Sequence, residues 1–286
     1  MSRLFDSRFL QTIQQLTLSA RFSIDGSTAG NRKSRSKGSS VEFSDYREYI
    51  PGDDFRRIDW NAYGRFEKLF VKLFMEEREA PVHIFLDVSK SMDWGEPNKS
   101  IASRRLAAAL AYISLANFDR VSVVCIDDGI QNMCRNLRGK NFFHKITDVL
   151  ENVHYTGRSS IQKSIESFSM QMGRGITVII SDFFSRENLN DIIKYLAYNK
   201  QSIYICHILS PQEIRPNMNE SVRLVDSETM ETVEITVTPS LLNSYSKALE
   251  SFKSQIERTC MKWGAYYLNF SSDMDVAEMV KEVAEH

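Results

Sequence analysis

The feature that most constrains this chain of 286 residues is an apolar strand pattern at residues 82–86 that ends in oxygen-bearing side chains. The run is almost continuously apolar, as in a parallel strand that is covered on both faces. Asp87, Ser89 and Ser91 follow it in the spacing Asp-x-Ser-x-Ser. Because open α/β sheets bind their ligands at the carboxyl ends of the strands, these three residues form a candidate ligand site.

A second strand pattern, at residues 176–180, ends in the same way, in Ser181 and Asp182. If both strands belong to one sheet, Asp87 and Asp182 lie close together, and two neighbouring carboxylates repel unless a cation lies between them. The one carboxylate and two hydroxyls of Asp87, Ser89 and Ser91 are a weak ligand set for Ca²⁺ but suit Mg²⁺ or Mn²⁺ that keeps several waters. Capping of the next helix by Asp87 and Ser89 is the alternative explanation of their spacing.

Strand and helix patterns alternate along the rest of the chain, which predicts a doubly wound, mainly parallel α/β sheet flanked by helices. Two segments with clean alternation, 222–226 and 232–237, predict an inserted β-hairpin. We divide the chain into an N-terminal α+β extension, residues 1–80, and a main domain, residues 81–286, with the hairpin near 220–238. Helices are expected at 5–18, 100–118, 142–153, 161–170, 189–198, 241–263 and 276–283, and further strands at 121–126, 202–209 and 265–270.

Composition indicates an ordinary globular protein, with 42% hydrophobic and 26% charged residues. A net charge of −1 gives no overall attraction to nucleic acid or to an anionic membrane. No apolar run approaches the roughly 18 residues of a membrane span, and the first residues lack the apolar core of a signal peptide. Four widely spaced cysteines favour buried free thiols. We therefore expect a cytoplasmic protein without a membrane span.

Two polar stretches precede the main domain. Residues 32–37 are locally basic, and because no aromatic residue is interleaved for base stacking, a solvated loop is favoured over nucleic-acid contact. Residues 51–54 read Pro-Gly-Asp-Asp within a segment dense in opposite charges. This pattern favours a turn held by ion pairs over an acid–base pair of Asp53 and Asp54, since nothing nearby supplies a nucleophile.

The strand-end residues resemble the metal-ion-dependent adhesion site of von Willebrand factor A domains. In that family one loop supplies Asp-x-Ser-x-Ser, a second loop a Thr and a later strand an Asp. Asp87, Ser89, Ser91 and Asp182 match these positions, and Ser159 takes that of the Thr. The resemblance implies that these five residues bind Mg²⁺ or Mn²⁺. Phe183 and Phe184 follow Asp182 at once, either as interface side chains or as plugs of the sheet edge.

A wider resemblance covers nearly the whole chain. Residues 38–60 contain Arg47-x-Tyr49-x-x-Gly52-Asp53-Asp54-x-Arg56-x-Ile58-Asp59-Trp60, and Asp-x-Ser-x-Ser-Met follows at residues 87–92. This series resembles the signature of a bacterial domain-of-unknown-function family, number fifty-eight, in its short branch without membrane helices. The resemblance implies a partnership with a MoxR-type AAA+ ATPase or with a client protein of that ATPase.

The leading functional prediction is therefore a metal-dependent protein-interaction module without enzymatic activity of its own. The alternative is a metal-assisted hydrolase, which needs a general base beside the metal. None of the five histidines is placed in either strand-end loop, and the chain has no Gly-x-x-x-x-Gly-Lys-Ser/Thr phosphate loop. Histidine 207, within a strand pattern, is expected to be a core residue.

Overall fold

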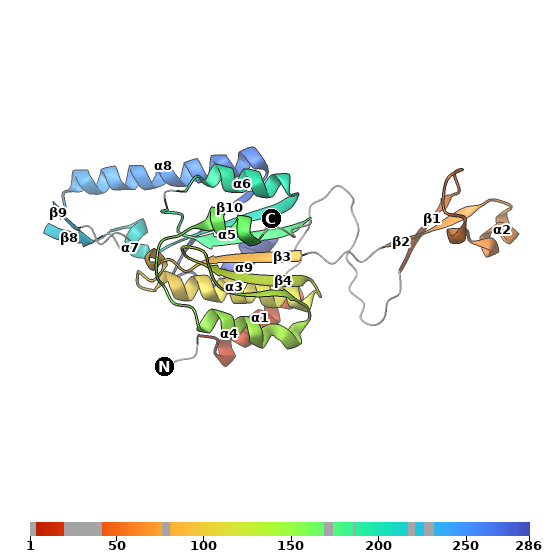
Figure 1. The fold of residues 1–286 in the computed structure, drawn as a ribbon, viewed down its shortest axis with the longest axis horizontal. Coiled ribbons are helices and arrows are strands. Elements are labelled where there is room, and N and C mark those ends of the chain that lie inside the picture. Colours follow the sequence, from red (N-terminus) through yellow and green to blue (C-terminus); the bar gives the residue numbers. More distant parts are fainter. Residues whose placement is uncertain are drawn as a thin grey trace. The chain divides into compact units, whose positions relative to one another are not determined.

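The computed structural model contains one six-stranded sheet in the order β10-β7-β6-β3-β4-β5 (Figure 1). It describes residues 4–19, 42–75, 81–168, 174–185, 187–216, 221–225 and 232–286. All neighbouring strands are parallel except β4 and β5, which form an antiparallel pair. The predicted doubly wound, mainly parallel sheet is thus confirmed. Its strands are β3 (Pro81–Asp87), β4 (Arg120–Ile126), β5 (Ile130–Leu137), β6 (Gly175–Ser181), β7 (Gln201–Leu209) and β10 (Tyr266–Ser271).

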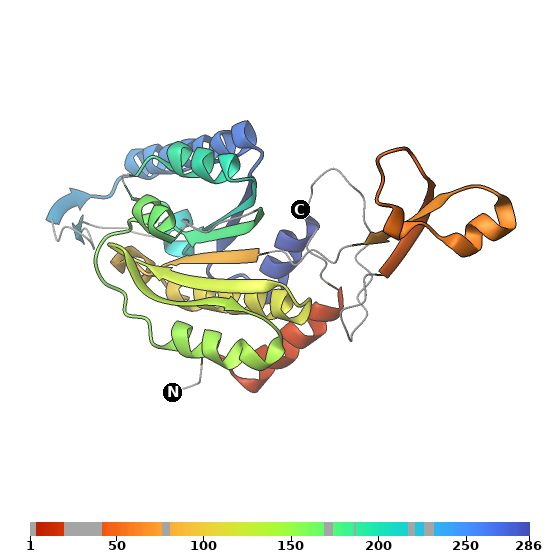
Figure 2. The same cartoon turned by 45° about the vertical axis from the view of Figure 1, so that its right-hand side comes forward.

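Helices cover both faces of this sheet (Figures 1 and 2). Side chains that alternate along β3 separate the two cores: Ile84 and Leu86 pack on one face, and Phe85 packs on the other. The first core contains α1 (Ser7–Ser19), α3 (Lys99–Ala116), α4 (Phe143–Glu151) and α9 (Val276–Glu285). The second contains α5 (Ile161–Phe168), α6 (Leu189–Tyr198) and α8 (Pro239–Trp263).

The register of the central strands brings their carboxyl ends to one edge. Asp87 at the end of β3 pairs with Ile126 of β4, and Leu86 pairs with Ile180 of β6. Ser181 of β6 pairs with His207 of β7. Residues that follow β3, β6 and β7 are therefore neighbours in space although they lie far apart in the sequence.

By packing, the chain forms two compact units: Met1–Asp25 with Ala80–His286, and Gly26–Glu79. The first helix, α1, therefore packs with the main unit, whereas the sequence analysis placed all of residues 1–80 in an extension. The smaller unit contains β1 (Glu42–Glu48) paired antiparallel with β2 (Phe70–Met75), a 3₁₀ helix (Phe55–Arg57) and α2 (Trp60–Phe66). The pairing of these two strands was not foreseen.

The turn at residues 51–54 belongs to the smaller unit and is held as expected by charged groups. Asp53 accepts hydrogen bonds from Arg47 at 2.7 Å and from the backbone of Ile50 at 3.0 Å. A second ion pair joins Lys68 and Glu48. The basic residues 32–37 lie outside the described residues.

Short elements complete the main unit. The hairpin is confirmed as β8 (Ser221–Val225) and β9 (Thr232–Thr236), which form a two-stranded sheet of their own. The short helix α7 (Pro211–Ile214) follows β7 directly. Two 3₁₀ helices, Lys90–Met92 and Lys140–Phe142, follow β3 and β5. Among the described residues, no helix combines the length and the apolar character that crossing a bilayer requires.

Candidate metal site

The loop after β3 holds the Asp-x-Ser-x-Ser residues in one turn. The side chain of Asp87 is fully buried, and its Oδ1 accepts a hydrogen bond from the backbone N–H of Ser89 at 2.9 Å. The hydroxyl oxygens of Ser89 and Ser91 lie 3.2 Å apart. The cap of the next helix, α3, is Asn98, and Ser89 makes no side-chain capping bond to its 3₁₀ helix. Helix capping therefore does not explain this spacing.

Two further hydroxyls reach the other oxygen of the same carboxylate. Ser159, in the loop before α5, donates to Asp87 Oδ2 at 2.8 Å, and Ser181, at the end of β6, donates to it at 2.5 Å. The structure thus brings Ser159 to Asp87, as the resemblance implied. Ser181 was not among the predicted site residues, although its place directly before Asp182 on a strand end was a visible signal.

The environment of Asp87 is unfavourable for a negative charge. Burial raises the pKa of its carboxyl to about 6, and the neighbouring carboxylate of Asp182 adds to the rise, while hydrogen bonds from Ser181 and Ser89 oppose it. Within the described ranges, no lysine or arginine pairs with Asp87. The fully buried acid is held by hydroxyl and amide donors, and no cation from the described part of the chain accompanies it.

Asp182 also lies at this edge, but a lysine neutralises it. The ammonium of Lys99, on the first residue of α3, lies 2.8 Å from Asp182 Oδ2 and 2.6 Å from Glu213 Oε1. The Lys99 side chain is fully buried. Burial alone would lower the pKa of Lys99, but the two carboxylates outweigh it and hold the pKa above its ordinary value. Lys99 is therefore a permanent internal cation of the cluster.

Glu213 comes from α7 and is held by the cap of that helix. The Ser210 hydroxyl accepts from the Glu213 backbone N–H, and Glu213 accepts from the Ser210 backbone N–H at 2.7 Å in return. The pattern Ser-x-x-Glu directly after an expected strand was the available signal for this residue. Lys99 carried no such signal, because a lysine at the start of a helix is usually solvated.

The side chains at this edge have the composition of a hard divalent cation site. When all are ionised, the carboxylates of Asp87, Asp182 and Glu213 and the ammonium of Lys99 leave two net negative charges. One Mg²⁺ or Mn²⁺ balances that charge. Among the described residues, no three His, Cys, Asp or Glu side chains are grouped as metal ligands. The available donors are therefore mostly hydroxyls, which suits a metal that keeps some of its waters. The donor chemistry fits this class of ion.

Histidine 207 is a core residue, as expected. It is fully buried, its Nδ1 lies 2.8 Å from the Tyr267 hydroxyl, and the rings of Phe183 and Phe252 pack against it. Burial lowers its pKa to about 4. Phe183 is buried, which agrees with a role in closing the sheet edge, whereas Phe184 is 45% exposed.

Comparison with known proteins identifies relatives of this chain. The model of the family described as "Protein of unknown function DUF58" matches residues 45–254. The uncharacterized protein Mb1516 of Mycobacterium bovis is 24% identical over 287 residues, which cover 98% of this chain and 90% of the relative.

Solved structures with similar folds have low sequence identity. The von Willebrand factor type A protein from Catenulispora acidiphila is 13% identical with a TM-score of 0.42, over 76% of this chain and 43% of that one. Proximal thread matrix protein 1 from the mussel byssus, described with a zinc-occupied MIDAS motif, is 11% identical with a TM-score of 0.40, over 72% of this chain and 45% of that one.

Proposed function

The chain belongs to the DUF58 family of unknown function, and we propose that this member is a metal-dependent protein-interaction module. The observation that carries the proposal is Asp87, a fully buried carboxylate that three groups of the chain hydrogen-bond and no described cation neutralises. A buried charge without a counter-ion is costly, and a bound divalent cation removes that cost.

In this proposal Asp87, Ser89, Ser91 and Ser159 hold Mg²⁺ or Mn²⁺ directly or through water. The carboxylate of Asp182, at the same sheet edge, attracts the ion electrostatically. When bound, the metal supplies a positive charge with an open ligand position that a partner's Asp or Glu can fill. Lys99 keeps Asp182 paired, so the ion is not saturated by carboxylates of its own chain. A carboxylate from outside then completes the site.

For the partner we propose a MoxR-type AAA+ ATPase or a client protein presented to it. This choice rests only on the resemblance of residues 38–60 and 87–92 to the family signature. The hydrolase alternative gains no support from His207, because this side chain is enclosed by aromatic rings and held neutral by its burial.

The test is capture of proteins from native lysate by the wild type and by Asp87→Ala, each with Mg²⁺ and with EDTA. Asp148→Ala, an exposed acid on α4, is the matched control. We expect a MoxR-type ATPase, identified by mass spectrometry, to be retained by the wild type and the control only with Mg²⁺, and not by Asp87→Ala. Retention of the same proteins in every condition would contradict the proposal.

A further inference from the structure

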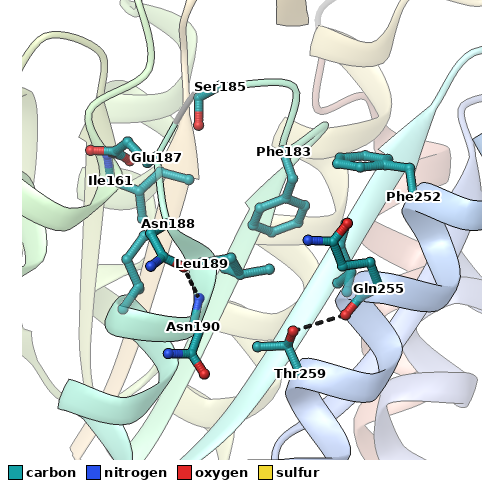
Figure 3. A pocket seen from close by; sticks show the side chains of 12 residues that line it. Ile161, Phe183, Ser185, Glu187, Asn188, Leu189, Asn190, Phe252, Gln255 and Thr259 are labelled. Atoms are coloured by element: carbon teal, nitrogen blue, oxygen red, sulfur yellow. Dashed lines mark hydrogen bonds between the residues drawn. The ribbon is translucent and has the colours of Figure 1, made fainter.

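A cavity of about 150 Å³ lies between α5, α6 and α8 (Figure 3). Phe183 and Leu189 point into it from the loop after β6 and the start of α6, and Phe252 faces them from α8. Its apolar lining is completed by Ile161, Ile192 and Ile256, all of which are buried. The polar lining residues are Ser185, Glu187, Asn188, Asn190, Gln255 and Thr259.

The volume of the cavity restricts its occupant to something small. Sites for drug-sized ligands and cofactors have volumes of roughly 300–1,000 Å³. An apolar-lined protein cavity of about 150 Å³ takes a molecule the size of benzene, and here the apolar residues make up half of the lining. The cavity is therefore too small for a nucleotide and matches one large apolar side chain, such as Leu, Ile, Met or Phe.

The cavity and the oxygen cluster are built by the same two loops. Asp182 belongs to the cluster, and the next residue, Phe183, lines the cavity. Ser159 binds Asp87, and Ile161, two residues later, lines the cavity. Since consecutive Cα atoms are about 3.8 Å apart, these pairs of backbone positions lie within about 8 Å of each other. An extended peptide spans that distance in about two or three residues.

The rim of the cavity offers groups that suit a peptide backbone. Among the described residues, the side-chain amide of Gln255 and the hydroxyl of Ser185 make no hydrogen bond. An amide side chain can both donate to a peptide carbonyl and accept from a peptide N–H. Gln255 is exposed, so its amide is open to an incoming chain, and Ser185 is half-buried.

The charge at the rim determines which side chain enters. Glu187 is the charged residue of the lining, and its carboxylate accepts hydrogen bonds from the backbone N–H groups of Ile161 at 2.7 Å and Gln162 at 3.3 Å. These bonds fix the carboxylate at the start of α5. An acidic side chain is repelled there, whereas an apolar side chain meets the apolar floor.

We propose that this cavity is a specificity pocket that binds one large apolar side chain of the partner segment whose carboxylate reaches the oxygen cluster. The inference deepens the proposed function and rests on it. The recognised segment is an extended peptide with one acidic residue and, about one to four residues away, one Leu, Ile, Met or Phe. The metal site binds the acidic residue, and the cavity binds the apolar residue.

The test uses short fluorescent peptides of Ala and Gly that carry one acidic residue, Asp in one set and Glu in the other. Each peptide has a Leu one to four positions away, and its matched peptide has Ser in place of Leu. Binding to the full chain is measured by anisotropy, with Mg²⁺ and with EDTA. The variants Thr259→Trp and Gln255→Trp fill the pocket or block its rim. Ser254→Trp, at an exposed position of α8 outside the lining, is the control.

We expect the Leu peptide to bind the wild type and Ser254→Trp at least tenfold more tightly than its Ser match at one spacing or more, because the cavity removes the apolar Leu side chain from water. In Thr259→Trp and Gln255→Trp this preference should fall to less than threefold, and in Thr259→Trp the Mg²⁺-dependent binding of the acid should remain. Circular dichroism and thermal unfolding check that the two variants fold. One folded variant is enough to test whether the Leu preference depends on the pocket.

Three results would overturn the inference. If acidic peptides bind with Mg²⁺ but show no Leu preference, or if the preference survives in the two pocket variants, the pocket assignment is wrong and the proposed function stands. If no acidic peptide binds in a Mg²⁺-dependent way, the proposed function itself fails and the pocket assignment falls with it.

Discussion

Two neighbouring strands, β3 and β6, each end in a buried aspartate, and the chain treats the two acids differently. Asp182, after β6, faces the ammonium of Lys99 at 2.8 Å. Asp87, at the end of β3, faces the hydroxyls of Ser159 and Ser181 and the N–H of Ser89. Within the residues that the structure describes, one acid is neutralised by a lysine, and the other is only hydrogen-bonded.

This difference separates a structural role from a binding role. The Lys99–Asp182–Glu213 group contains its own cation, and it ties α3 to the ends of β6 and β7. Asp87 is positioned by hydrogen bonds that orient it but leave its charge uncompensated. In the proposed function the ligand requirement lies at Asp87 and the support lies at Lys99, and the variants that follow test these two roles one at a time.

The largest effect is expected from Lys99→Met. This variant leaves Asp182 and Glu213 without their cation, and removing one partner of a buried ion pair costs about 3–5 kcal/mol. Chemical denaturation should show a loss of this size in the free energy of unfolding. Lys163→Met, at an exposed position of α5, is the control and should change stability by less than about 0.5 kcal/mol. Equal losses in the two variants would show that the ion pairs of Lys99 do not stabilise the folded chain.

The second largest effect is expected from added Mg²⁺, which should raise the free energy of unfolding of the wild type. Mg²⁺ at about one hundred times its Kd should stabilise the wild type by about 2.7 kcal/mol. The gain should be smaller near pH 5 than near pH 8, because protons compete for Asp87, whose pKa is raised to about 6. Thermal unfolding with and without Mg²⁺ measures this difference. A Mg²⁺ effect of the same size in Asp87→Asn would place the metal elsewhere.

A smaller effect is expected when Asp87 is replaced by Asn in the absence of metal. Because burial raises the pKa of Asp87 from 3.8 to about 6, the folded state favours the protonated acid. The wild type therefore loses stability as the pH rises from about 4 through about 6, and remains weakened above it.

Since Asn resembles the protonated acid, Asp87→Asn should be as stable as the wild type at pH 4 and more stable near pH 8, by on the order of 2 kcal/mol. Asp182→Asn should instead destabilise the protein near pH 8, because Lys99 loses a partner. Urea unfolding at the two pH values measures both. Stabilisation by both substitutions, or by neither, would remove the difference between the two acids.

The smallest effect is expected from Ser159→Ala. It deletes one hydrogen bond to Asp87, which is worth about 0.5–1.5 kcal/mol, and should weaken Mg²⁺ binding severalfold without abolishing it. Ser160→Ala, the adjacent serine, is the matched control. A loss of Mg²⁺ affinity with Ser160→Ala alone would move the metal ligand by one residue.

The sequence predicted those parts of the fold and site that depend on local pattern. Apolar runs gave the central strands, and their abrupt polar ends placed Asp87 and Asp182 at one edge, because parallel strands end on the same side. The pairing of Glu42–Glu48 with Phe70–Met75 could not be read, since those strands are short and separated by a turn and a helix.

The charge balance of the site was not predictable in the same way. Lys99 and Glu213 lie 114 positions apart in the sequence and meet only because α3 and α7 both begin at the same sheet edge. A lysine at a helix start is exposed in most proteins, and only packing shows that this one is buried. The cavity beside Phe183 depends on how three helices pack, and sequence periodicity does not determine that either.

The most direct test of the central claim is a titration of the wild type and Asp87→Asn with Mn²⁺, followed by electron paramagnetic resonance, with Mg²⁺ as competitor. We expect one Mn²⁺ per wild-type chain, displaced by Mg²⁺, and loss of that binding in folded Asp87→Asn. Binding that is absent in the wild type, or unchanged in Asp87→Asn, would contradict it.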